Sequence, residues 1–129
     1  MQKLIIIDDD PFFHFIVEKI MNRHSDSTTV LYSKDGMAVI NHLKDNLYNE
    51  SLLPDFIFVD ISMPLFDGWD FVKMYEEFSS SIYKTIKIYV VSSSINPKTI
   101  RKMMSYPFIS NYIVKPMTKK VLEGILNLD

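Results

Sequence analysis

A run of four aliphatic residues, followed at once by three aspartates and a proline, constrains the fold of this chain most. The residues are Leu4, Ile5, Ile6, Ile7, Asp8, Asp9, Asp10 and Pro11. An uninterrupted apolar run is typical of a strand that is buried on both faces, as in a parallel sheet. Asp10 followed by Pro11 predicts a helix N-cap and the first helical position. The acids therefore lie between a buried strand and a helix, where open α/β sheets place their sites.

Length and composition restrict the class of protein. The chain has 129 residues and a formal net charge of −2. We expect one domain over residues 1–129, without the basic surplus of a nucleic-acid-binding protein. The sequence contains no cysteine, which excludes disulfides and cysteine catalysis. No apolar run approaches the roughly 18 residues of a membrane span, and no signal peptide precedes the first strand, so we expect a cytoplasmic protein with no membrane contact.

Apolar, strand-like runs alternate five times with segments of helical periodicity. The predicted strands cover residues 3–7, 28–32, 56–59, 86–91 and 109–114. The predicted helices cover 11–23, the stretch from the cap at Asp35 to about 47, the stretch that follows the turn 63–68 and ends at about 78, the stretch from 97 to before Pro107, and the stretch after 118. This alternation predicts an α/β domain with a parallel sheet. Helical spacing predicts packing faces of Phe12, Phe13, Ile16, Val17, Ile20 and Met21 on the first helix and of Val121, Ile125 and Leu128 on the last.

Polar side chains stand where the predicted strands end. Asp8 and Asp9 end the first strand, Asp60 the third, Ser92 the fourth and Lys115 the fifth. The carboxyl ends of parallel strands meet at one edge, with neighbouring strands about 4.8 Å apart. If the first and third strands are neighbours, the three acids converge on a site for Mg²⁺. Carboxylates, a hydroxyl and a lysine suit a phosphoryl group, and Asp60 is the best candidate for a carboxylate nucleophile.

These segments together resemble the receiver domain of response regulators in two-component signalling, over essentially the whole chain. The matching segments are residues 5–9, 59–60, 63–64, 67–68, 91–93 and 112–116. The resemblance implies a flavodoxin-like (βα)5 three-layer sandwich with a five-stranded parallel sheet of order 2-1-3-4-5. It also implies a response regulator of the stand-alone type, not an enzyme beyond catalysis of its own phosphorylation and dephosphorylation.

The resemblance implies a role for individual residues. Mg²⁺ would be bound by Asp8, Asp9, Asp60 and the backbone carbonyl of Ser62. Asp60 would accept a phosphoryl group from a histidine kinase or a phosphotransfer protein.

Three further positions match the family's response to phosphorylation. Ser92 would donate a hydrogen bond to the phosphoryl group, and Lys115 would pair with it. The peptide bond between Lys115 and Pro116 would be cis. Ser92 and Tyr112 would form the switch, with Tyr112 in the aromatic position that turns inward.

Output is expected through a protein–protein contact. The helix after the fourth strand, the fifth strand and the last helix would form the surface that contacts an unknown downstream protein, and a homodimer through the same face is an alternative. The candidates to line it, some of which must be core, are Ile100, Met103, Met104, Tyr106 and Tyr112.

Other functions are weighed on the same residues. Asp8 and Asp10 have the Asp-x-Asp spacing of a haloacid-dehalogenase-like phosphatase, but Pro11 follows them and we expect no cap domain. A binding module that acts without phosphate is disfavoured by the complete set of acids. An FMN protein is disfavoured because the acidic loop would repel a phosphate. Asp10 and Asp67 are expected to cap helices, and Gly68 to supply backbone freedom.

Overall fold

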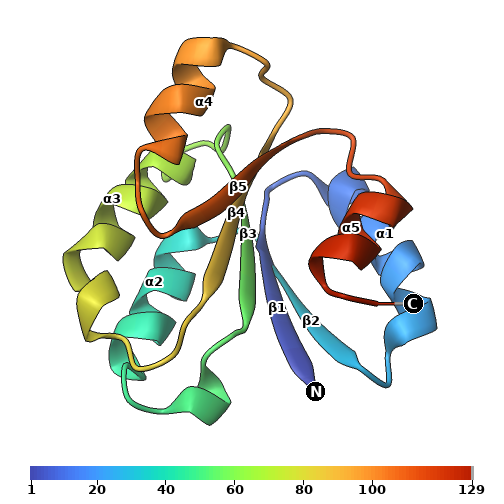
Figure 1. Cartoon of the computed structure of the whole chain (residues 1–129), viewed down its shortest axis with the longest axis horizontal. Helices are drawn as coiled ribbons and strands as arrows, with labels where there is room; N and C mark the ends of the chain where they lie inside the picture. Colours follow the sequence, from blue (N-terminus) through green and yellow to red (C-terminus); the bar gives the residue numbers. More distant parts are fainter. Residues whose placement is uncertain (129) are drawn as a thin grey trace.

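In the computed structural model, which describes residues 1–128, one parallel sheet lies between two layers of helices (Figure 1). The strands are β1 (Gln2–Ile7), β2 (Thr28–Ser33), β3 (Phe56–Asp60), β4 (Lys87–Ser92) and β5 (Ile109–Val114). The helices are α1 (Pro11–Met21), α2 (Gly36–Asp45), α3 (Gly68–Phe78), α4 (Pro97–Met104) and α5 (Lys119–Ile125). The strand order β2-β1-β3-β4-β5 confirms the flavodoxin-like fold.

The sheet separates two apolar cores. In β1, Leu4 and Ile6 join the core beneath α1 and α5, whereas Ile5 and Ile7 join the core beneath α2, α3 and α4. All five residues of β3 are buried, which agrees with its place in the middle of the sheet. Both faces of these strands are covered by helices, and this explains why their sequences are continuously apolar. Within residues 1–128, no helix is long and apolar enough to cross a bilayer.

Each α-helix begins at a side chain that accepts a hydrogen bond from the first turn. The capping residues are Asp10, Asp35, Asp67, Asn96 and Thr118. Asp67 and Asp70 form a reciprocal capping box at the start of α3. The predictions that Asp10 and Asp67 are helix caps are therefore confirmed, and these caps fix where each helix leaves the sheet edge.

Two of the predicted packing faces are wrong in part. Phe12 is 66% exposed and Val121 is 41% exposed. The buried stripe of α1 is instead Phe13, Val17 and Met21, at a spacing of four residues. A neighbour one position away on a helix is rotated by about 100°, so Phe12 faces solvent. In the same way, the C-terminal segment is anchored by the buried Leu122 and Leu126.

Several predicted boundaries also shift. The first helix stops at Met21 and continues as a 3₁₀ turn, Asn22–His24, while the last helix ends at Ile125. The segment between α2 and β3 contains a 3₁₀ turn, Glu50–Leu52, and the fully buried Leu53.

Gly68 is required for space. An added Cβ at this position would lie 2.6 Å from the backbone oxygen of Asp60 and 2.7 Å from the Cα of Ile61. Its amide donates to the carbonyl of Ile61 at 3.0 Å, so α3 starts pressed against the end of β3. No glycine in the described chain has a positive φ. The expectation that Gly68 supplies backbone freedom is therefore wrong, because the close approach of two backbone segments excludes a side chain.

We predict that Gly68→Ala lowers the free energy of unfolding by about 1–3 kcal/mol, the range for overpacking at a tight site. Gly124→Ala is the matched control, because an added Cβ there meets nothing within 4 Å. That change should leave stability equal or raise it by about 0.5–1 kcal/mol through helix propensity. Urea denaturation measures the free energy of unfolding of the two variants and of wild type. If Gly68→Ala is as stable as wild type, the steric argument is contradicted.

Candidate functional site

Three carboxylates converge at the carboxyl edge of the sheet. β1 lies beside β3 with Ile7 opposite Val59, so the residues that follow, Asp8 and Asp60, are neighbours. One oxygen each of Asp8, Asp9 and Asp60 lies within 4.8 Å of the others. Asp8 is 1% exposed and Asp60 6% exposed, while Asp9 is partly exposed. The sequence prediction that these three acids meet is confirmed.

Lys115 places an ammonium group between the two buried acids. Its Nζ donates to Oδ2 of Asp8 at 2.8 Å and lies 3.6 Å from Oδ2 of Asp60. The other oxygen of Asp8 accepts from the amide of Asp10 at 2.9 Å, and Oδ1 of Asp60 accepts from the amide of Ser62 at 3.3 Å. One cation therefore faces three anions in this cluster, which leaves negative charge uncompensated.

The charge imbalance alters the protonation of the cluster. Burial, followed by the charge of Asp8, raises the pKa of Asp60 to about 6, although Lys115 and the Ser62 amide partly oppose the rise. Burial alone would lower the pKa of Lys115, but the hydrogen bond and charge of Asp8 outweigh it and raise that pKa. Ionised Asp60 is thus destabilised in its surroundings, and a bound cation would relieve the repulsion.

Ser92 and Tyr112 are joined through the backbone of one residue. Ser92 is 1% exposed at the end of β4, and its Oγ accepts from the amide of Ser94 at 3.1 Å. The hydroxyl of Tyr112, which is 9% exposed, donates to the carbonyl of Ser94 at 2.9 Å. The amide of Lys115 donates to the carbonyl of Ser92 at 2.8 Å. Ser92 is therefore connected to β5 through Ser94 and Tyr112, and to the residue that follows β5 through the Lys115 amide.

The structure adds residues that sequence reasoning did not place in the site. The ring of Phe13 lies 4.6 Å from Nζ of Lys115 and supports the ammonium by a cation–π contact. Phe13 was expected only in the core, and its apolar character carries no signal for this contact. Ser94 contributes through its backbone, which no side-chain motif can reveal. The bond between Lys115 and Pro116 is cis, as the resemblance implies.

The donor atoms suit a hard divalent cation. Mg²⁺ binds oxygen ligands and commonly uses one or two carboxylates together with water molecules. Asp8, Asp9 and Asp60 offer three carboxylate oxygens within reach of a common point, and Asp9 is open to solvent. Ser62 lies exposed in the loop after β3, where its amide binds Asp60. The residues present therefore fit a magnesium site. That the backbone carbonyl of Ser62 is a further ligand stays a prediction.

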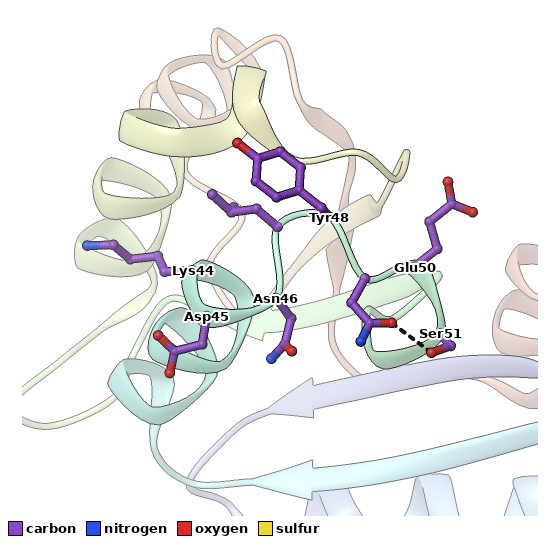
Figure 2. A pocket seen from close by; sticks show the side chains of 8 residues that line it. Lys44, Asp45, Asn46, Tyr48, Glu50 and Ser51 are labelled. Carbon is purple, nitrogen blue, oxygen red and sulfur yellow. Dashed lines mark hydrogen bonds between the residues drawn. The ribbon is translucent and has the colours of Figure 1, made fainter.

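Two other features of residues 1–128 do not form a competing site. Oδ1 of Asp10 accepts from the amide of Phe12 at 2.9 Å and Asp10 is exposed, which disfavours the phosphatase pairing of Asp8 with Asp10. A surface hollow along residues 44–51 precedes β3 and so lies at the opposite edge of the sheet. Figure 2 shows that Lys44, Tyr48 and Glu50 point in different directions, and that the hydrogen bond drawn there joins Ser51 to Asn49, two residues away in the chain.

Comparisons with known proteins agree with this site. The chain is 28% identical over 127 residues to a probable C4-dicarboxylate response regulator, DctR, of Halalkalibacterium halodurans, with 96% of the chain and 49% of the relative covered. It is 27% identical over 126 residues to the chemotaxis protein CheY1 of Helicobacter pylori, covering 98% of the chain and 94% of that relative. The chain thus spans about half the length of DctR and almost all of CheY1.

Among solved structures, a two component response regulator from Cytophaga hutchinsonii superposes with a TM-score of 0.82 at 26% identity, covering 98% of the chain and 95% of that structure. The receiver domain of the sensor histidine kinase PA1611 from Pseudomonas aeruginosa PAO1 superposes with a TM-score of 0.75 at 16% identity, covering 98% and 94%, which shows a shared fold. The family profile of the response regulator receiver domain matches residues 4–127. The chain therefore belongs to the response regulator receiver domain family of two-component signalling.

Proposed function

We propose that this chain receives a phosphoryl group on Asp60 from a histidine kinase or a phosphotransfer protein, with Mg²⁺ as cofactor, and that this changes its contacts with a downstream protein. The proposal depends chiefly on one observation: Asp60 is buried at the point where Asp8, Asp9 and Lys115 meet. A cytoplasmic location and the absence of any other enzymatic activity remain predictions.

The chain's own residues account for the chemistry of transfer. An oxygen of Asp60 attacks the phosphorus of a phosphohistidine, the new P–O bond forms as the P–N bond breaks, and the imidazole leaves. The ammonium of Lys115 is 3.6 Å from Oδ2 of Asp60 and can pair with the transferred group. Oγ of Ser92 accepts from Ser94, which leaves its hydroxyl proton for a phosphoryl oxygen.

Mg²⁺ would be bound by Asp8, Asp9 and Asp60, with the predicted help of the Ser62 carbonyl. When bound, it would neutralise charge on the carboxylates and on the phosphoryl oxygens. The magnesium in the active site cleft of the PA1611 receiver domain, a neighbour in fold, supports this choice of metal. A relative described as the sensor histidine kinase CheAY of Helicobacter pylori supports a kinase as partner.

Switching would follow the connection at Ser94. A phosphoryl group that recruits the hydroxyl of Ser92 would pull on the Ser94 amide, and the Ser94 carbonyl is the acceptor of Tyr112. Ser94 immediately precedes the segment that leads into α4, and Tyr112 belongs to β5. The surface that responds would therefore be formed by α4, β5 and α5.

We predict that incubation with Mg²⁺ and a small phosphodonor adds one phosphoryl group, detected by intact mass. Asp60→Asn should remove this adduct because the amide is not a nucleophile of comparable strength. Asp67→Asn is the control, since Asn also caps helices and Asp67 is the N-cap of α3. An adduct that persists in Asp60→Asn would refute the assignment of the acceptor.

The fluorescence of Trp69 should change when beryllofluoride is added, because Lys102 of α4 lies 5.2 Å from the Trp69 ring and would move with α4.

We predict that Asp9→Asn weakens Mg²⁺ binding about tenfold or more, because a carboxylate ligand becomes neutral. Asp10→Asn is a matched control, because it removes the same charge one residue away while retaining the cap of α1. Calorimetric titration with Mg²⁺ compares the two. Equal losses in both variants would indicate a general effect of charge and contradict ligation by Asp9.

We predict that Asp60→Asn is more stable than wild type at pH 7.5 in EDTA, on the order of 2–3 kcal/mol. The pKa of Asp60 is raised in the folded protein from 3.8 to about 6, so the native state binds more protons than the unfolded state between these values. Wild type is therefore stabilised as the pH falls through 6 toward 4, and the difference in free energy of unfolding between Asp60→Asn and wild type should shrink. Urea denaturation across this pH range measures that difference. A difference that does not change with pH would contradict the raised pKa of Asp60.

A further inference from the structure

Among residues 1–128, four lysines lie over aromatic rings, and one of these contacts belongs to the candidate site. The pairs are Lys19 with Phe15, Lys87 with Phe56, Lys102 with Trp69 and Lys115 with Phe13. The distance from Nζ to the ring centre is 4.6 Å for Lys115 and at least 5.2 Å for the other three. Phe13 is only 6% exposed, and cation–π contacts strengthen when they are removed from water.

The ring of Phe13 holds the Lys115 ammonium without occupying a particular N–H. Nζ donates to Oδ2 of Asp8 at 2.8 Å and lies 3.6 Å from Oδ2 of Asp60. The face of an aromatic ring attracts the positive charge as a whole, whereas a carboxylate accepts from one donor in a fixed direction. Because an ammonium group has three N–H donors, Lys115 keeps donors free for Asp60 or for a group bound to Asp60.

Lys115 has a second place to which its charge can turn. A hollow of about 300 Å³ opens beside it, lined by Phe13, by other apolar side chains and by the exposed Asp10. The lysine side chain is 19% exposed, and its flexible four-carbon stem lets the ammonium reach more than one acid. Without the Phe13 ring, the ammonium would be free to turn from Asp60 toward Asp10 and solvent.

A bound divalent cation makes the ring more important. Asp8 belongs to the carboxylates that fit Mg²⁺, and it is also the acceptor of Lys115. A carboxylate that shares its charge with a metal ion attracts an ammonium group less strongly, and the metal ion itself repels that group. The ring is uncharged and offers no ligand oxygen. The contact with Phe13 is therefore the one that the metal does not weaken.

We infer that Phe13 is a positioning residue for phosphoryl transfer, because its ring keeps the Lys115 ammonium beside Asp60 while Asp8 is engaged by the metal. This inference rests on the proposed function, in which Lys115 pairs with the group that Asp60 receives. An aliphatic side chain at position 13 would fill the core but leave the charge unsupported. In this role Phe13 acts through Lys115, and a correctly placed cation is what a developing phosphoryl charge requires.

The test changes the electron density of the ring and leaves its shape nearly unchanged. The full chain is made with trifluorophenylalanine at position 13, because fluorine withdraws electrons from the ring face and weakens the cation–π contact. With Mg²⁺ and a small phosphodonor, this protein and Phe13→Leu should form the Asp60 adduct about threefold to tenfold more slowly than wild type. Intact mass, followed over time, measures the rate.

Phe56 supplies a matched control. It is also 6% exposed, belongs to the same core as Phe13 and lies 5.8 Å from Nζ of Lys87. It begins β3, at the edge of the sheet opposite the site. Fluorination of Phe56, or Phe56→Leu, should lower stability about as much as the same change at position 13 and leave the rate of adduct formation unchanged. Equal slowing at both positions would indicate an effect of core packing and overturn the inference.

A second readout follows the lysine itself and needs no activity. Protons above the face of an aromatic ring resonate upfield, so the ε-methylene of Lys115 should be displaced upfield in proton–carbon correlation spectra of the metal-free protein. Lys115→Arg identifies the signal among those of the other lysines that lie over rings. The displacement should disappear in Phe13→Leu and persist when Mg²⁺ and beryllofluoride are added to wild type.

Two further results would overturn the inference. One is an equal rate of adduct formation with and without fluorination of Phe13, and the other is a Lys115 signal that moves to the position of an exposed lysine when Mg²⁺ and beryllofluoride bind. Failure of the proposed function looks different, because wild type then gains no adduct whatever the Lys115 signal shows. An adduct on wild type that forms equally fast in the fluorinated protein refutes only the role of Phe13.

Discussion

The rest of the structure depends on one electrostatic imbalance, in which three carboxylates face a single ammonium group. Asp8 and Asp60 are both almost fully buried, and Lys115 reaches the two from another strand end. Burial of like charges is costly, and here it raises the pKa of Asp60 to about 6. The fold tolerates this cost at the edge where Asp9 opens to solvent. A bound divalent cation would compensate this negative charge, and it would be needed still more once an anionic phosphoryl group is added.

The remainder of the architecture holds that cluster in place. Parallel pairing brings the ends of β1, β3, β4 and β5 to one edge, and caps at the following helices direct the chain away from it. Gly68 allows α3 to start against the backbone of Asp60, and Phe13 supports the Lys115 ammonium from α1. Positions that sequence alone would assign to packing therefore also define the geometry of the site.

The site and the proposed output surface share one short connection. Ser94 accepts from Tyr112 through its carbonyl and donates to Ser92 through its amide. In the switching that we propose, a changed hydrogen bond at Ser92 would bias the position of the segment before α4. Packed cores transmit such shifts because their arrangements are discrete.

The sequence by itself determined the class of fold, the ends of the strands to within one residue, and the identity of the converging acids. Hydrophobic periodicity and helix capping depend on residues that are close together in the chain. The caps at Asp10 and Asp67 and the fully apolar β3 were therefore predictable from the sequence. Tertiary structure alone decided which aliphatic residues are covered, because Phe12 and Val121 satisfy the helical spacing yet face solvent. It also decided why Gly68 must be glycine, how Lys115 lies between Asp8 and Asp60, and how Ser94 joins Ser92 to Tyr112. These contacts join segments far apart in the chain, or use backbone atoms that no side-chain pattern records.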